Sequence, residues 1–155
     1  MHTGGDWDWR SFEDLSIHEL YALLQLRAAV FVVEQTCFYQ DIDGLDQNAW
    51  HCLYRENGRL LAYQRCLPPE QSYIDASAIG RVVVDPSARG RGLSRKLLRR
   101  GIDFNRATWP DHGVKLSAQA HLQGLYESLG FVTCSEPYLE DGIPHVHMRL
   151  SSTPT

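Results

Sequence analysis

The chain has 155 residues, 43% of them apolar and 22% charged, and it carries a formal net charge of −4. This length supports one domain with a hydrophobic core and is short for two, so we expect a single domain over residues 1–155 with a core of about 7–150. No apolar run approaches the roughly 20 residues that a membrane-spanning helix needs, which excludes that class of protein and favours the cytoplasm.

The four cysteines match neither a zinc site nor a disulfide framework. Cys37, Cys52, Cys66 and Cys134 include no C-x-x-C pair, and the seven histidines include no i, i+4 pair of the metalloprotease kind. We therefore expect free thiols in a reducing cytoplasm and no metal ion.

The N-terminal part of the chain predicts a short strand followed by one long helix. The strand is expected over residues 6–12 and the helix over residues 15–35, where apolar residues recur with helical spacing. Ser16 and Glu19 have the spacing of a capping box, which satisfies backbone N–H groups at the start of a helix. The apolar face of this helix is expected to consist of Leu20, Leu24, Ala28 and Phe31.

A hairpin and a further strand are expected next. The strand-like residues 50–56 and 59–67 flank Asn57-Gly58, a dipeptide that favours a tight hairpin turn because both residues adopt positive φ readily. The third strand, residues 78–84, is rich in β-branched side chains and stops at Asp85-Pro86.

The C-terminal half alternates helices and strands. Helices are expected over residues 91–107 and 121–131, and strands over residues 114–120, 131–139 and 144–150. The buried faces of the two helices would consist of Leu93, Leu97, Leu98 and Ile102 in the first, and of Leu122, Leu125 and Leu129 in the second, which Gly130 ends. The order β-α-ββ-β-α-β-α-β-β predicts an α+β domain in which helices cover a mixed sheet.

The stretch from Asp85 to Arg100 places two glycines and a cluster of basic residues where a strand gives way to a helix. Backbone N–H groups at a helix start attract anions, and glycines let an anion approach the backbone without a Cβ in the way. No G-K-[ST] follows, and the spacing is not G-x-G-x-x-G, so neither a P-loop nor a dinucleotide fold is supported. The residues alone leave two interpretations open: a pyrophosphate site, or solvated arginines beside turn glycines.

The same stretch resembles the acyl-coenzyme A (CoA) motif of the GNAT superfamily of N-acetyltransferases, Q/R-x-x-G-x-G/A at the start of a helix. In this chain the motif is Arg89-Gly90-Arg91-Gly92-Leu93-Ser94, with serine where the family usually has glycine or alanine. The segment LYESLGF, residues 125–131, resembles a second segment of that family, fYeklGF. Residues 26–51 and 138–148 are similar to the ElaA-like branch of the superfamily.

This resemblance implies a GNAT-type fold, a mixed and mostly antiparallel sheet flanked by helices, and the activity of an acetyl-CoA-dependent N-acetyltransferase. The acetyl group would pass directly from the thioester to an amine within a ternary complex. Tyr126 would act as general acid toward the leaving thiolate, and Gln119 stands where many members have an asparagine near the pantetheine arm. The implied cofactor contacts are Val82, Val83, Val84, Arg89, Gly90, Arg91, Gly92, Leu93, Ser94, Arg95 and Gln119.

The acceptor is expected to be a small-molecule or peptide amine, and its proton needs a base. Candidates by residue type are Glu34, Asp41, Asp43, His51 and His145. Glu34 is preferred as the catalytic residue because it leads from the long helix into the loop that borders the acceptor in this fold. The other four are candidate acceptor contacts.

The acidic loop after the long helix does not match a calcium site of the EF-hand kind. With Gly44 at position six of an EF-hand loop, positions one and twelve are Tyr39 and Trp50, so a calcium loop is excluded. One remaining interpretation is a turn with solvated carboxylates. The other is an acidic mouth that attracts a cationic amine, formed by Glu34, Asp41, Asp43, Glu140 and Asp141.

Two functions other than acetyl transfer are compatible with parts of the sequence. The same fold could bind or sense acyl-CoA without catalysis. The basic stretch could contact nucleic acid, but no aromatic residues are interleaved with it and the remainder of the chain is acidic, so no nucleic-acid partner is expected. A homodimer is left open.

Overall fold

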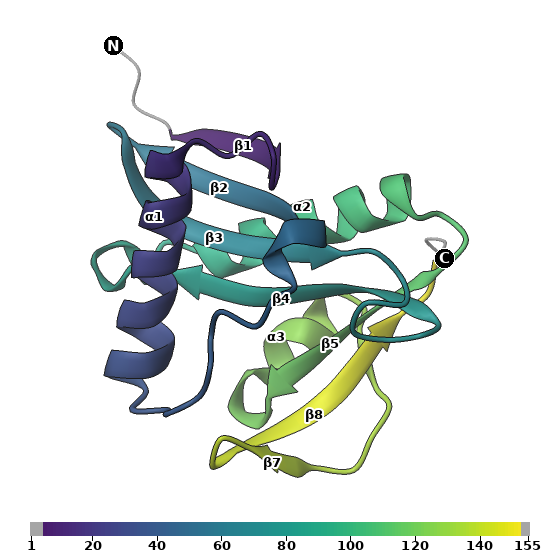
Figure 1. Ribbon diagram of the computed structural model, residues 1–155. Coiled ribbons are helices and arrows are strands. Elements are labelled where there is room, and N and C mark those ends of the chain that lie inside the picture. The colour runs from purple at the N-terminus through teal and green to yellow at the C-terminus, as the bar shows by residue number, and fades with distance from the viewer. Residues whose placement is uncertain (1–4, 153–155) are drawn as a thin grey trace.

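The computed structural model of the chain describes residues 5–152, so the two ends of the predicted domain, residues 1–4 and 153–155, lie outside the described residues. One eight-stranded sheet forms the centre, in the order β1-β2-β3-β4-β5-β8-β6, with β7 also paired to β8 (Figure 1). Its strands are β1 (Asp6–Ser11), β2 (Trp50–Glu56), β3 (Arg59–Leu67), β4 (Ala76–Val84), β5 (Gly113–Gln119), β6 (Val132–Thr133), β7 (Tyr138–Glu140) and β8 (Ile143–Leu150).

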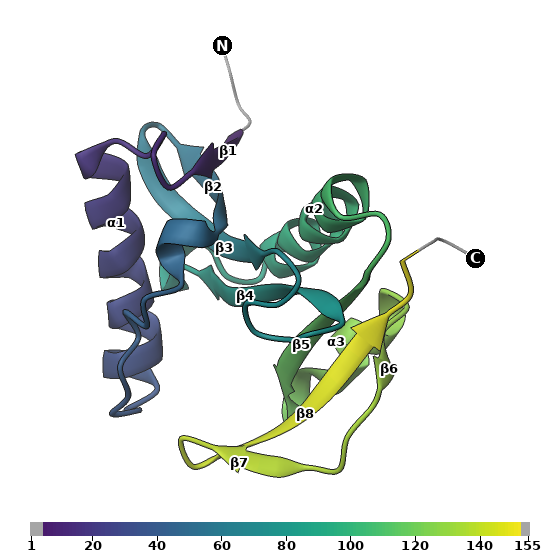
Figure 2. The ribbon, with the colours of Figure 1, turned by 45° about the vertical axis from the view of Figure 1, so that its right-hand side comes forward.

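Helices cover both faces of this sheet. Helix α1 (Ile17–Arg27) lies against one face, and α2 (Leu93–Thr108) and α3 (Gln123–Ser128) lie on the other (Figure 2). Every strand pair is antiparallel except β4 with β5, which is parallel. The predicted fold, a mixed and mostly antiparallel sheet flanked by helices, is therefore confirmed. Within residues 5–152 no helix combines the length and apolar character needed to cross a membrane.

The first helix starts as predicted but changes its geometry along its length. The capping box is confirmed, since the Ser16 hydroxyl accepts from the Glu19 N–H and the Glu19 carboxylate accepts from the Ser16 N–H. After Arg27 the helix continues as a π-helix, Ala28–Glu34, whose wider turns are uncommon and often occur near functional sites. The single helix predicted over residues 15–35 is therefore a composite.

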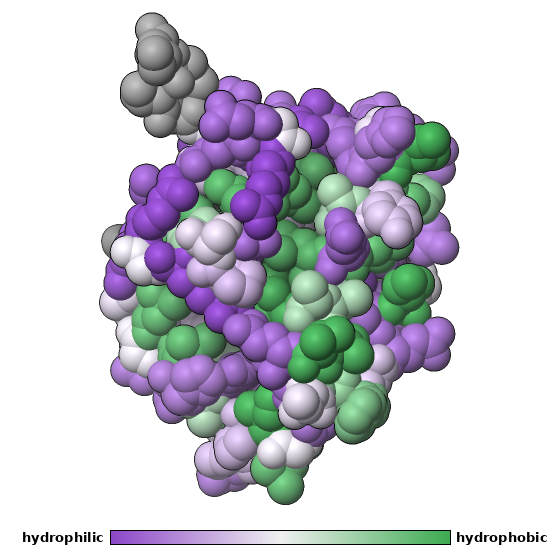
Figure 3. Space-filling view, turned by 90° about the vertical axis from the view of Figure 1, so that its left-hand side faces the viewer, coloured by the Kyte–Doolittle hydropathy of each residue, from purple (hydrophilic) through white to green (hydrophobic). Residues whose placement is uncertain are grey.

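The buried face of this helix differs from the predicted one. The buried side chains are Leu23, Leu26, Arg27 and Val30, whereas Ala28 is exposed and Leu20, Leu24 and Phe31 are only partly buried. Apolar side chains occur on several sides of the helix, and Ile17 and Tyr21 are exposed. Viewed from the α1 side, the surface shows apolar patches among hydrophilic side chains (Figure 3). The spacing of apolar residues in the sequence therefore did not identify which face of the helix is buried.

The hairpin turn and the second helix follow the predictions closely. Asn57 and Gly58 have φ of +52° and +77°, as a two-residue hairpin turn requires. All four residues expected on the inner face of α2 are buried, namely Leu93, Leu97, Leu98 and Ile102.

The C-terminal part differs more from the predictions. The predicted helix over 121–131 is a 3-10 turn, Ala120–Leu122, followed by α3, and Leu122 is exposed rather than inward-facing. Gly130 ends it with a φ of +100°. The strand predicted over 131–139 is split into β6 and β7. Between them, the Ser135 hydroxyl accepts a hydrogen bond from the backbone N–H of His147 on β8.

Strands β4 and β5 separate after a short parallel contact, and this separation positions the candidate site. Only Ala76 to Ala78 pair with β5. Further along β4, Gly80 pairs with Arg65 and Val83 with Tyr63, so Arg81 and Val82 face a single residue of β3. Such a bulge bends a strand, and Arg81 has a φ of +53°, which is unusual for a residue with a side chain. The two strands therefore diverge toward their carboxyl ends.

Candidate functional site

A cleft of about 960 Å³ lies where β4 and β5 diverge. Its walls include every residue of β4 between Ile79 and Val84, and also Leu116, Ser117 and Gln119 of β5. Several residues predicted from the sequence line it: Glu34, Asp43, Val82, Val83, Val84, Arg89, Ser94, Gln119, Tyr126 and His145. The predicted residues outside the lining are Asp41, His51, Gly90, Arg91, Gly92, Leu93 and Arg95.

The loop between Arg89 and Ser94, the two residues that line one end of the cleft, has the geometry of an anion site. Gly90 and Gly92 adopt φ of +80° and +75°, and a Cβ at either position would meet no atom within 4 Å. Helix α2 begins directly after Gly92, and none of the side chains of residues 5–152 caps its first N–H groups. Uncapped N–H groups at the positive end of a 16-residue helix attract anions. The loop therefore has both the charge and the open space that a pyrophosphate requires.

The arginine side chains of this loop are paired with glutamates. Arg89 donates two hydrogen bonds, of 2.7 and 2.6 Å, to the two carboxylate oxygens of Glu34, and Arg91 pairs with Glu56. The hydrogen bonds from Arg89 lower the pKa of Glu34 below its ordinary value. Glu34 is thus tied to the anion site rather than free to face the acceptor side of the cleft.

Tyr126 lies on α3 with its hydroxyl available to the cleft. The residue is 8% exposed, its ring packs edge-to-face against Phe131, and no residue among 5–152 forms a hydrogen bond with its hydroxyl. Burial raises the pKa of Tyr126 to about 12. Its phenol is therefore protonated at neutral pH and can donate a hydrogen bond to a group in the cleft.

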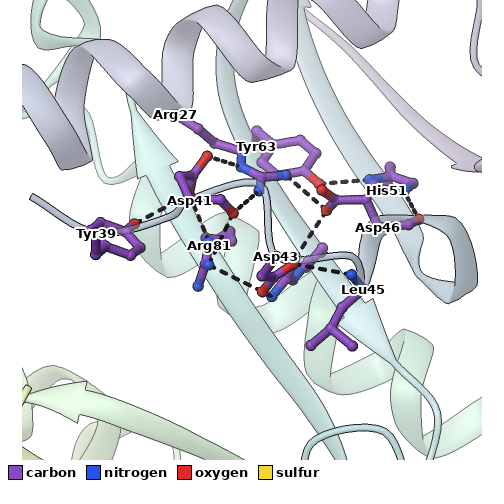
Figure 4. Close-up of polar contacts among 10 residues, drawn as sticks. Arg27, Tyr39, Asp41, Asp43, Leu45, Asp46, His51, Tyr63 and Arg81 are labelled. Carbon is purple, nitrogen blue, oxygen red and sulfur yellow. Dashed lines mark hydrogen bonds and ion pairs between the residues drawn. The ribbon is translucent and has the colours of Figure 1, made fainter.

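The carboxylates of the acidic loop after α1 differ most from the predictions, because they are paired with arginines. Arg27 pairs with Asp41 at 2.9 Å and with Asp46 at 2.8 Å. Arg81 pairs with Asp41 and Asp43 (Figure 4). Arg65 pairs with Asp43 and Asp46. Three arginines thus neutralise three aspartates. The expectation of solvated carboxylates in this turn is wrong.

This network changes the roles open to Asp41 and Asp43. Asp41 is 8% exposed, does not line the cleft, and accepts hydrogen bonds from two arginines, so its role as an acceptor contact is corrected to a structural one. Burial raises the pKa of Asp43, but hydrogen bonds and charge from Arg65, with the charge of Arg81, outweigh this and lower the pKa to about 2. Asp43 lines the cleft, but it cannot hold a proton at neutral pH.

The two candidate histidines have different positions. His51 is fully buried, and its ring nitrogens lie 2.6 Å from the Tyr63 hydroxyl and 2.9 Å from the Asp46 carbonyl oxygen. Burial lowers the pKa of His51, so it is a neutral core residue, and its expected contact with the acceptor is corrected. His145 lines the cleft, donates from Nδ1 to the Ile143 carbonyl at 2.7 Å, and places Nε2 3.4 Å from Glu140.

Sequence reasoning missed the arginines Arg65 and Arg81 and the serine Ser117, all of which line the cleft. A charged residue within an apolar strand, such as Arg65 in RLLAYQRCL, was the available indication of a buried ion pair. Ser117 had no such indication, since an isolated serine in a strand is common. Of the acidic mouth, Glu140 and Asp141 line the cleft without an arginine partner among residues 5–152.

The chain is similar over most of its length to one protein family and to several known proteins. The family described as acetyltransferase (GNAT) domain matches residues 18–152. Protein ElaA of Escherichia coli (strain K12) is 46% identical over 145 residues, which cover 92% of this chain and 94% of that protein. A crystal structure of an acyl-CoA N-acyltransferase from Pseudomonas aeruginosa is 49% identical, with a TM-score of 0.90 over 94% of this chain and 99% of the other. The crystal structure of Escherichia coli ElaA is 44% identical, with a TM-score of 0.88 and coverage of 94% and 98%.

Proposed function

The chain belongs to the GNAT acetyltransferase family, in its ElaA-like branch, and from this premise we propose that it transfers an acetyl group directly from acetyl-CoA to an amine in a ternary complex. One observation carries the proposal: a single cleft joins the uncapped start of α2 to the free hydroxyl of Tyr126. A polyanionic cofactor and a proton donor for its leaving group would thus occupy one continuous site. The acceptor would be a small-molecule or peptide amine.

The residues present fit the cofactor. The backbone N–H groups from Gly90 to Ser94 would hold the pyrophosphate, because the glycines leave space and no side chain competes for these groups. Peptide groups of Val82 to Val84, which line the cleft, would bind the pantetheine amides, and Gln119 lies across from them on β5. When bound, acetyl-CoA supplies the activated acetyl thioester.

Acetyl transfer to an amine requires a polarised thioester carbonyl, a stabilised leaving sulfur and a neutral amine, and the chain's own groups account for the first two. Backbone N–H groups at the β4 bulge, around Arg81 and Val82, would polarise the thioester carbonyl as an oxyanion site does. Tyr126 would donate a hydrogen bond to the departing sulfur. Because its pKa of about 12 exceeds the roughly 8.5 typical of a thiol, we expect it to stabilise the thiolate by hydrogen bonding more than by complete proton transfer.

Thiol release from acetyl-CoA in the presence of a panel of amines tests this proposal. We expect release that depends on the amine and saturates with both substrates. Because Asp41 and Asp43 are neutralised, cationic amines are expected to gain only the modest, salt-sensitive advantage that Glu140 and Asp141 can provide. Tight binding of acetyl-CoA without thiol release for any amine would support the alternative, a non-catalytic acyl-CoA sensor.

Glu34 gives a second prediction, on cofactor affinity. If the pyrophosphate attracts Arg89, it competes with Glu34 for that guanidinium. Replacing Glu34 with glutamine is therefore expected to lower the Kd for acetyl-CoA by about two- to five-fold, since the competing ion pair is exposed and weak. Isothermal titration calorimetry at low and high salt would measure this.

The matched control for that measurement is Glu13→Gln, which makes the same charge change at an exposed position outside the cleft lining. An unchanged or raised Kd in Glu34→Gln would mean that Arg89 keeps its glutamate partner when the cofactor binds.

A further inference from the structure

A chain of hydrogen-bonding side chains leads out of the acceptor side of the cleft. Ser117 of β5 lines the cleft with Tyr126, and it lies directly opposite His147 of β8. The Tyr138 hydroxyl on β7 hydrogen-bonds to the Ser117 hydroxyl and lies 3.5 Å from Nδ1 of His147. The Tyr138 and His147 rings also stack, with centroids 4.8 Å apart. Three strands thus bring three proton-transferring groups into one row.

The far end of this row can accept a proton at neutral pH. Partial burial lowers the pKa of His147, and the positive charge of Lys115 lowers it further against the opposing effect of Glu140. The ring also faces Tyr73, which packs edge-on at 5.8 Å, the His145 side chain, and the Leu116 backbone, whose hydrogen bond to the ring acts to raise the pKa. The imidazole is therefore neutral, and because it is only partly buried it can pass a proton to water.

Two of the acids suggested by the sequence, Glu34 and Asp43, are poorer bases than this histidine. Glu34 is paired with Arg89 in a bidentate contact, and Asp43 has a pKa of about 2. A carboxylate held in its ionised form by arginines is a weak proton acceptor. By contrast, a neutral imidazole is suited to general-base catalysis near neutral pH.

We propose that Ser117, Tyr138 and His147 form a proton relay for the acceptor amine, an inference that rests on the proposed acetyl transfer. The ammonium N–H bond breaks and its proton moves to the Ser117 oxygen, while the serine proton moves to Tyr138 and the tyrosine proton to Nδ1 of His147. The nitrogen keeps its electron pair and attacks the acetyl carbon, and His147 returns the proton to solvent. As the amide forms, the C–S bond breaks and the sulfur departs as a thiolate that the Tyr126 hydroxyl stabilises, while the second proton leaves the nitrogen for solvent.

Steady-state kinetics of Ser117→Ala, Tyr138→Phe and the double variant test the relay in the full-length chain. At neutral pH each single variant is expected to lower kcat by about 10²-fold, with an unchanged Kd for acetyl-CoA. The double variant is expected to lose no more than either single one, because the residues act as one unit. The deficit should shrink as the pH rises toward the pKa of the amine, since the acceptor then arrives neutral.

Several other outcomes would overturn the proposal. Additive losses, a deficit that stays constant with pH, or parental rates would overturn the relay while leaving acetyl transfer intact. Absence of thiol release by the parent chain with every amine would overturn both. If Tyr138→Phe does not fold, His147→Gln breaks the row at its other end and is expected to give the same pH-dependent loss. The exposed Tyr21 provides the control Tyr21→Phe, expected to keep the parental pH profile.

Discussion

Replacing Tyr126 with phenylalanine is expected to lower kcat for acetyl transfer by about 10²- to 10³-fold while leaving the Kd for acetyl-CoA within about two-fold of the parent. The phenol hydroxyl has no hydrogen-bond partner among residues 5–152, so its removal leaves no buried group unsatisfied. The ring keeps its edge-to-face contact with Phe131, at 6.0 Å between centroids. The variant therefore separates the chemistry of the hydroxyl from the packing of the ring.

The measurement is thiol release under single-turnover and steady-state conditions, alongside a thermal melt. An unchanged melting temperature with reduced turnover would assign the loss to catalysis. If instead Tyr126→Phe kept the parental kcat, Tyr126 would be a packing residue and the leaving sulfur would need another donor. Tyr126→Ala is a less informative variant, because it also removes the contact with Phe131 and lowers stability.

The second large effect is expected on stability, from Arg27→Met. Arg27 is fully buried and donates to the carboxylates of Asp41 and Asp46 and to the Asp41 carbonyl. Methionine fills a similar volume but leaves two buried carboxylates with fewer partners, and removing one member of a buried ionic network typically costs about 3–5 kcal/mol. We expect a loss of this size in the free energy of unfolding.

Denaturant unfolding at neutral pH measures this loss, and Arg59→Met provides the comparison. Arg59 pairs with Asp85, but its side chain is 64% exposed, so its replacement should change the unfolding free energy by less than about 1 kcal/mol. Equal effects of the two substitutions would show that burial does not strengthen the network. A stable Arg27→Met variant would show that Arg65 and Arg81 alone are sufficient to hold the acidic loop.

The acceptor side was the least predictable part of the site. The sequence suggested five acids and two histidines near the amine, yet His51 is a buried core residue and Asp41 is enclosed by arginines. Asp41 lies 14 residues from Arg27 and 40 from Arg81 along the chain, so no local pattern could pair them. Their ionisation and exposure depend on partners that only the folded sheet brings together.

What the sequence by itself determined was local. The capping box of Ser16 and Glu19, the Asn57-Gly58 turn and the glycines before α2 each depend on backbone geometry within a few residues. The tertiary structure alone decided which face of α1 is buried, where β4 leaves β5, and which carboxylates remain available to an amine. These outcomes depend on burial and ion pairing between distant segments, since desolvation and charge act through space and not along the chain.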